Sequence, residues 1–206
     1  DVVCHFEGDR QTSLRFVRAL KNRFGPTDEV GCFEMTGDGI AEVPDPSGLF
    51  LGHGTPVSGS CVTVALEGRR ALPVEIQALV NPSSTPNPRR VVNGVDSSRV
   101  AMILAVLERR AGLKLSALDV YVSTVGGVRL TEPAADLAIA LAIASALGEF
   151  AIPHEVAAVG ELSLSGEIRA VAQLSQRRTE ASRLGFVQFV DAAAKHLPTA
   201  LDTVRT

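Results

Sequence analysis

The chain has 206 residues, of which 46% are hydrophobic and 21% are charged, and its formal net charge is −3. These values are typical of one or two soluble globular domains and exclude a disordered tail or a low-complexity polymer. The longest apolar run, residues 137–147, has about half the length that crossing a bilayer requires, so we expect no membrane contact.

The first quarter of the chain predicts strands and turns. It begins at Asp1 with no initiator methionine and no signal peptide, so we expect a fragment or a processed chain. Residues 2–6 read as a strand, and residues 13–24 are compatible with either a helix or an extended segment. Residues 30–35 and 40–43 flank a glycine-containing turn and predict a hairpin. A glycine- and proline-containing linker over residues 52–56 marks a domain boundary.

The rest of the chain alternates strands with helices, which indicates an α/β domain. Expected strands lie at residues 60–66, 71–80, 91–95, 118–124, 156–161, 167–171 and 186–190, with a proline-containing surface loop over residues 81–90. A first helix is capped by Asp96 and stopped by Gly112. A second runs from Glu132 to Leu147 and is stopped by Gly148. Because this second helix is apolar nearly all round, we expect it to be buried centrally. A third spans residues 174–184.

Charge is unevenly distributed along the chain. Residues 1–52 carry five basic and nine acidic side chains, whereas residues 53–206 carry 15 basic and 14 acidic ones. Seven arginines but only three acidic residues fall within residues 69–110. Arginine grips phosphate bidentately, so this cluster is compatible with nucleic-acid contact. A solvated, salt-bridged surface is the alternative.

Metal and disulfide chemistry is not indicated. Cys4, Cys32 and Cys61 form no CxxC pair, so we expect buried free thiols in a reducing cytoplasm. The four histidines are too widely separated to suggest a metal site. The chain also lacks GxxxxGK[ST], GxGxxG and GxSxG motifs, so it has no P-loop of its own.

Several motifs resemble the bacterial RadA (Sms) family. They include Phe6-Glu7-Gly8-Asp9-Arg10, Lys21-Asn22-Arg23-Phe24-Gly25, and runs at residues 92–96, 126–128, 132–138 and 160–169. The resemblance implies an α/β (α+β) fold with two parts. Residues 1–52 would be the last strands and hairpin of a RecA-like ATPase core. Residues 53–206 would be a Lon-protease-like domain of the ribosomal protein S5 domain 2 type.

The Lon-like part raises the question of peptidase activity. Lon-type peptidases use a serine–lysine dyad, and the resemblance places Ala134 at the serine position and Ser175 at the lysine position. The three lysines of the chain all read as surface or interface residues. Without an activated nucleophile no acyl-enzyme forms. We therefore expect a proteolytically inactive domain, with a Lon-type peptidase as a distant alternative.

The resemblance also implies a DNA-dependent ATPase and branch-migration helicase acting in recombination and repair. ATP and magnesium would be bound mainly by an ATPase core outside this chain, and zinc only by an N-terminal finger outside it. The partners would be single-stranded and branched DNA, further copies in a homohexamer, and the recombinase RecA. The Lon-like domain would serve as hexamer scaffold and DNA contact; the alternative is a pure oligomerisation module.

Two groups of residues are candidate sites. Lys21 would reach the nucleotide of a neighbouring subunit as a trans-acting cation, with Arg23 as a second phosphate or interface contact. Six arginines are candidates for DNA phosphates: Arg69, Arg70, Arg89, Arg90, Arg109 and Arg110. For Arg109 and Arg110, pairing with Glu108 or with a neighbouring subunit is the other interpretation.

Overall fold

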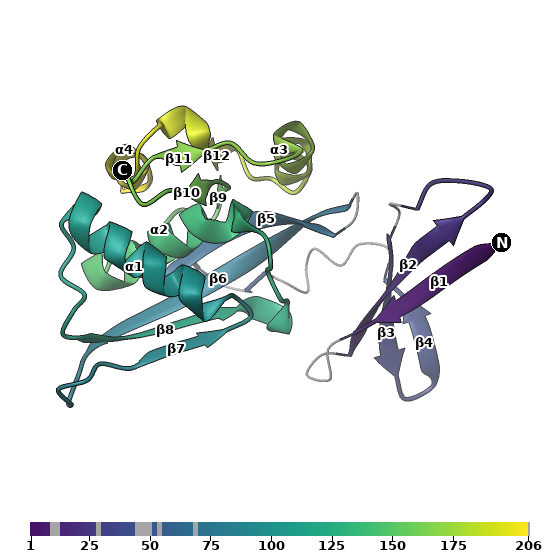
Figure 1. Ribbon diagram of the computed structural model, residues 1–206, viewed down its shortest axis with the longest axis horizontal. Coiled ribbons are helices and arrows are strands. Elements are labelled where there is room, and N and C mark those ends of the chain that lie inside the picture. Colours follow the sequence, from purple (N-terminus) through teal and green to yellow (C-terminus); the bar gives the residue numbers. More distant parts are fainter. Residues whose placement is uncertain (9–12, 28–29, 44–50, 53–54, 68–69, 206) are drawn as a thin grey trace.

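The computed structural model contains two main β-sheets, which are drawn on opposite sides of the view in Figure 1. It describes residues 1–8, 13–27, 30–43, 51–52, 55–67 and 70–205. Residues 53 and 54 of the predicted linker and Arg69 of the arginine cluster therefore lie outside the described residues.

The first sheet is an antiparallel meander of four strands in chain order. The strands are β1 (Val2–Glu7), β2 (Leu14–Asn22), β3 (Val30–Thr36) and β4 (Gly39–Glu42). The sequence alone favoured neither helix nor strand for residues 13–24. The structure makes them a strand, because β2 pairs with β1 on one side and with β3 on the other, which satisfies its backbone in both directions.

The second sheet is mixed and has six strands in the order β12-β9-β5-β6-β8-β7. Their bounds are β5 (Ser60–Glu67), β6 (Arg70–Pro82), β7 (Arg90–Asn93), β8 (Leu118–Thr124), β9 (Val156–Ala158) and β12 (Gln188–Val190). β5, β6 and β8 are antiparallel neighbours, whereas β7 with β8, β5 with β9, and β9 with β12 are parallel. Parallel neighbours need crossover connections, and helices supply them. The α/β expectation is confirmed at this level.

Helix α1 (Ser97–Ala111) begins and ends where the sequence predicts. The Asp96 carboxylate accepts a hydrogen bond from the Arg99 backbone N–H at 2.9 Å, and Gly112 closes the helix in the left-handed conformation. Hydrogen bonds from the Ser98 hydroxyl and the Arg99 N–H hold the pKa of Asp96 below its ordinary value. Helix α1 connects β7 to β8 as the crossover of a parallel pair.

Helix α2 (Asp136–Gly148) follows the 3₁₀ turn η3 (Pro133–Ala135) and contributes most of its residues to the main apolar core. Residues 136–145 are all buried, as its apolar sequence predicts. The predicted stop at Gly148 is wrong. Gly148 is still helical, and Glu149 takes the left-handed conformation with φ 52° while its N–H binds the carbonyl of Ser145. The Ser145 hydroxyl also donates a hydrogen bond to the carbonyl of Phe150. The helix therefore ends one residue later than expected.

The expected strand over residues 156–161 is divided in the structure. β9 ends at Ala158, and β10 (Glu161–Leu162) forms a separate hairpin with β11 (Ile168–Arg169). The cause is Gly160, whose N–H donates to the carbonyl of Ala134 at 2.9 Å and whose carbonyl accepts from the N–H of Leu137 at 3.1 Å. The backbone at this point therefore bonds to the start of α2 instead of to the sheet.

The C-terminal segment contains helix α3 (Leu174–Arg183), the 3₁₀ turn η4 (Ala192–Ala194) and helix α4 (Leu197–Val204), with a further 3₁₀ turn, η2 (Val125–Gly127), after β8. α3 matches the prediction, but α4 was missed. Its buried residues Leu197, Ala200, Leu201 and Val204 have the helical spacing that could have revealed it.

Two apolar clusters lie on opposite faces of the second sheet. Alternate residues of β6, including Leu72, Val74 and Ile76, pack with α1, α2 and α4. Ala71 and Val64 belong to a smaller cluster with Ala181 of α3. Because successive strand residues point to opposite faces, the two clusters use the two sides of one sheet.

The thiol prediction is only partly correct. Cys32 and Cys61 are buried, but Cys4 is exposed on β1, and all three are free. Burial raises the pKa of the Cys61 thiol to about 12, so it stays protonated at neutral pH. None of the helices in the described ranges is long and apolar enough to cross a membrane.

Candidate functional site

Lys21 and Arg23 lie at the tip of the first sheet. Lys21 is near the end of β2 and Arg23 is in the turn that follows; both side chains are exposed. The turn is held by the Asn22 side chain, which accepts from the Phe24 N–H at 3.0 Å and donates to the carbonyl of Pro26 at 3.1 Å. Phe24 is 82% exposed. An aromatic ring and two cations thus project together from a short, hydrogen-bonded turn.

The two positions that the sequence compares with a Lon dyad have different surroundings. Ala134 belongs to η3 and is buried in the small cluster beside α3, whereas Ser175 is exposed near the start of α3. Glu132, just before η3, and Arg177 of α3 form an ion pair in this part of the fold.

Arg177 is fully buried and joins three elements. Its Nη atoms donate to both carboxylate oxygens of Glu132, at 2.7 and 2.5 Å, and one of them also donates to the carbonyl of Val64 in β5 at 2.5 Å. Its Nε donates to the carbonyl of Ala172 at 3.0 Å. Glu132 in turn accepts from the N–H of Leu66 at 3.0 Å. The pair therefore fixes α3 and η3 against β5, and sequence reasoning missed it.

A second buried ion pair stands at the start of α2. The Arg99 guanidinium binds both oxygens of Asp136, its Nε at 2.8 Å from Oδ1, and the Leu162 N–H donates to Oδ2 at 3.1 Å. Burial raises the pKa of Asp136 despite these donors. This pair joins the first turns of α1 and α2 to the β10–β11 hairpin, so its role is structural.

The structure divides the six DNA-contact candidates. Arg89 and Arg90 precede and begin β7, while Arg109 and Arg110 end α1, which runs antiparallel to β7. These four therefore lie at one end of the β7–α1–β8 unit. Arg70 begins β6, twelve residues before the Pro82 that pairs with β8 at that end, and Arg69 lies outside the described residues.

These four arginine side chains differ in how many hydrogen bonds they make within the chain. The Arg90 guanidinium donates to the carbonyls of Leu118 and, at 3.0 Å, Leu115, so it ties β7 to the start of β8. Arg110 makes a single long contact, 3.4 Å, from Nε to the carbonyl of Leu164. Arg89 and Arg109 have exposed side chains.

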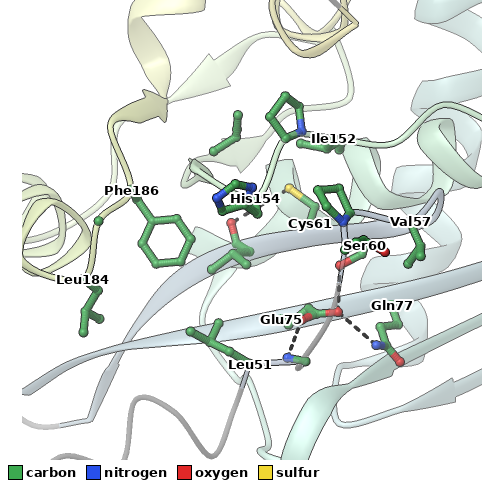
Figure 2. A pocket seen from close by; sticks show the side chains of 17 residues that line it. Leu51, Val57, Ser60, Cys61, Glu75, Gln77, Ile152, His154, Leu184 and Phe186 are labelled. Atoms are coloured by element: carbon green, nitrogen blue, oxygen red, sulfur yellow. Dashed lines mark hydrogen bonds between the residues drawn. The ribbon is translucent and has the colours of Figure 1, made fainter.

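A pocket of about 490 Å³ opens beside the linker, on the face of β5 and β6 away from α2 (Figure 2). Its lining is mixed: Leu51, Leu184 and Phe186 are apolar, whereas His154 is polar. Its floor is the Glu75 carboxylate, which accepts from the Ser60 hydroxyl at 2.7 Å, the Gln77 amide at 2.9 Å and the Gly52 N–H at 2.5 Å. Glu75 thereby anchors the linker to the sheet. No sequence motif predicted this contact between Glu75 and Gly52.

Metal ligands do not gather within the described ranges: no three His, Cys, Asp or Glu side chains there come together as a metal site requires. His5, His154 and His196 are exposed, and His53 lies outside the described residues.

Comparison with known proteins places this mixed α/β chain in a class. A family model described as subunit ChlI of Mg-chelatase matches residues 98–195, from α1 to just beyond η4. Proteins named DNA repair protein RadA match much more of the chain. The protein from Mycolicibacterium smegmatis is 54% identical over 92% of this chain, and that from Bacillus subtilis is 46% identical over 94%. The Mycobacterium tuberculosis H37Rv protein is 48% identical over the whole of this chain, which covers 43% of that protein.

The resemblance to RadA proteins that was read from the motifs is therefore confirmed. Over the length that matches, nearly all of this chain is similar to proteins of the RadA family. It spans only about two fifths of these relatives, 41% of the M. smegmatis protein and 43% of the B. subtilis protein.

Proposed function

We propose that this chain is the C-terminal portion of a DNA-dependent ATPase and branch-migration helicase that acts in homologous recombination and repair. The observation that carries the proposal is the 46–54% identity to RadA proteins along nearly the whole chain. ATP and magnesium would be bound mainly by a core outside this chain, and zinc by an N-terminal finger outside it. DNA, RecA and further copies of the protein, in a cytoplasmic homohexamer, are the proposed partners.

Residues 1–52 are proposed as the end of the ATPase core. Strand β1 supports this, because Val2, Val3 and Phe6 are 50%, 47% and 60% exposed. Adjacent residues Val2 and Val3 point to opposite faces, so β1 is apolar on both sides although it lies at a sheet edge. A strand of this kind is typical of the covered centre of a larger sheet.

Residues 53–206 are proposed as a Lon-protease-like domain without peptidase activity. The buried methyl group of Ala134 offers no nucleophile, and the Arg177–Glu132 pair beside it is saturated with structural hydrogen bonds. The domain would instead hold the ring together and contact DNA. Hydrolysis of casein by the purified protein would overturn this part of the proposal.

DNA contact is assigned to the arginine end of the β7–α1–β8 unit. Arg89 and Arg110 are exposed there, whereas Arg90 is held by backbone carbonyls. For Arg109 the sequence also allows pairing with a neighbouring subunit. Arginine bound to phosphate carries no base readout, so we propose sequence-independent binding. A module that only oligomerises is the second candidate, and a mobility shift with the intact protein and branched DNA separates the two.

The trans-acting role of Lys21 gives the sharpest test. In the full-length protein, Lys21→Ala should lower DNA-stimulated ATP turnover at least about 10-fold, because the cation that neutralises charge on the γ-phosphate is lost. Arg23→Ala should have a smaller effect in the same direction. Lys195→Ala, another exposed lysine, is the matched control and should leave turnover unchanged.

Ring assembly must be measured alongside turnover, by gel filtration with light scattering. The assignment requires that Lys21→Ala assembles like the unmodified protein. Unchanged ATP turnover and unchanged branch migration in Lys21→Ala would remove Lys21 from the nucleotide site.

A further inference from the structure

Glu75 of β6 carries a buried negative charge. The residue is 9% exposed, and its carboxylate accepts hydrogen bonds from the Ser60 hydroxyl, the Gln77 amide and the Gly52 N–H. All three donors are neutral. Within the described residues Glu75 forms these hydrogen bonds but no ion pair. Because a buried charge is costly unless it is both hydrogen-bonded and paired, the carboxylate still lacks a counter-ion.

The other buried charged side chains of the described ranges all have a partner of opposite charge. Asp136 and Arg177 are at most 1% exposed, and Asp191 is 4% exposed. Each of them contacts an oppositely charged side chain, in the pairs Arg99–Asp136, Arg177–Glu132 and Arg178–Asp191. Glu75 is the exception among these buried charges, and this points to a cation from outside the chain.

The surroundings of Glu75 leave its negative charge uncompensated. Burial first, and then the negative charge of Glu75, raise the pKa of the Cys61 thiol to about 12. His154 also lines the pocket, but its side chain is 80% exposed and its Nδ1 lies 3.2 Å from Oε2 of Glu155. The three neutral donors therefore fix the orientation of the Glu75 carboxylate without cancelling its charge.

A ligand can reach this carboxylate through the pocket described above (Figure 2). The pocket volume of about 490 Å³ is typical of small-molecule sites. Apolar side chains from separate segments face the same space: Leu51 before the linker, Ile152 before β9, and Leu184 and Phe186 after α3. A fitting ligand thus combines one positive group for Glu75 with an apolar body for these side chains.

The hydrogen bonds of Glu75 select the kind of cation. An ionised carboxylate has about four acceptor positions, two on each oxygen. Oε1 accepts from both Ser60 and Gln77 and is full, whereas Oε2 accepts only from Gly52 and has one position left. A guanidinium prefers to bind both oxygens at once and would find Oε1 occupied. A primary ammonium is a compact charge that one oxygen can hold.

We propose that this pocket binds a primary amine with an apolar chain, its ammonium on Oε2 of Glu75 and its chain against Leu184 and Phe186. The Ser60 hydroxyl oxygen and the Gln77 amide oxygen keep acceptor capacity for the other ammonium hydrogens. The ligand is a free amine or the lysine side chain of another protein, since both present the same group. This site is separate from the proposed roles of Lys21 and of the arginines.

The first test compares hexylamine with hexanol, which has the same chain without the charge, by isothermal titration calorimetry on the intact protein. Hexylamine should bind at least about 10-fold more tightly, because a charge-assisted hydrogen bond is gained. Glu75→Gln should abolish this preference and leave the affinity for hexanol unchanged, which shows that the pocket is still formed. Glu167→Gln, at an exposed carboxylate outside the pocket, is the matched control and should keep the preference.

A second variant tests the acceptor geometry without touching a buried residue. Gln77 is exposed, so Gln77→Ala should fold normally, and it frees one acceptor position on Oε1. The unmodified protein should bind hexylamine more tightly than hexylguanidine. In Gln77→Ala the affinity for hexylguanidine should rise about 10-fold, because both oxygens can now accept from the fork of the guanidinium. An unchanged order of affinities in Gln77→Ala would overturn the assignment of Oε2.

A blocked peptide distinguishes the two sources of the amine. If acetyl-Leu-Lys-Leu-amide binds more tightly than hexylamine, and Glu75→Gln removes that binding, the ligand is a lysine side chain of another protein. If hexylamine binds and the peptide does not, the ligand is a free amine. The proposal is overturned if neither charged probe binds better than its uncharged counterpart, which is hexanol for the amine and the norleucine peptide for the lysine peptide.

Discussion

Arg177 has no exposed side-chain surface, yet its guanidinium makes four hydrogen bonds, two of them to Glu132. A buried charge of this kind is tolerated only when it is paired and its donors are satisfied. Both conditions are met here, because β5, the residue before η3 and the segment that leads into α3 each supply acceptors. In the part of the fold where a peptidase comparison looks for a dyad, the described residues therefore form a rigid joint between elements.

Breaking this pair should be strongly destabilising. Arg177→Met leaves the Glu132 carboxylate without its cation and should lower the free energy of unfolding by about 3–5 kcal/mol, measured by urea denaturation. Arg183→Met is the control on the same helix. It removes an exposed pair with Glu180 and should cost under about 1 kcal/mol.

A double variant distinguishes the pair from general damage to α3. Adding Glu132→Gln to Arg177→Met removes the unpaired charge and keeps an acceptor for the Leu66 N–H, so it should recover a large part of the lost stability. Equal costs for Arg177→Met and Arg183→Met would contradict the structural role.

At the scale of elements, α2 shows how local signals and packing compete. Its apolar sequence predicted burial correctly, and the proline at its start predicted where the helix begins to within a turn. Its end was predicted at Gly148 from glycine alone. The Ser145 hydroxyl accepts a hydrogen bond from the Gly59 N–H, 86 residues away in sequence, and donates to the nearby Phe150 carbonyl. These bonds move the chain reversal to Glu149.

The left-handed Glu149 offers a stabilising substitution. At φ 52° a side chain is strained and glycine is not, so Glu149→Gly should raise the stability by about 0.5–1 kcal/mol, seen as a higher Tm. Glu149→Ala keeps a Cβ atom at the same φ and is the matched control. If the alanine variant gains as much as the glycine variant, backbone strain at this position is not the cause.

At the scale of the whole molecule, the fold gathers positive charge at one end of the β7–α1–β8 unit although the net charge is −3. This separation allows a mildly acidic protein to bind DNA through one region. Arg70, which the sequence places in the same cluster, is brought to the opposite end of β6.

This separation predicts a specific salt response for the intact protein. Affinity for branched DNA should fall with salt on a log–log plot with a slope of about −2 or steeper, because at least two phosphates are neutralised per subunit. The double variant Arg89→Ala/Arg110→Ala should flatten that slope by about 2. Arg183→Ala/Lys195→Ala, which removes the same charge elsewhere, should leave the slope unchanged. If the DNA affinity of the unmodified protein does not change between low and physiological salt, the arginines at this end of the β7–α1–β8 unit do not bind DNA phosphates.

The sequence by itself determined the α/β class, most strands and three helices, because alternation, helical periodicity and end signals such as Asp96 and Gly112 are local properties. It also determined the RadA resemblance, because KNRFG is a continuous run. Tertiary structure alone decided that residues 13–24 form a strand, that β9 ends before Gly160, and that Arg177 is buried against Glu132. Each of these depends on partners tens of residues away, and no local pattern encodes which distant backbone group will satisfy a given donor or charge.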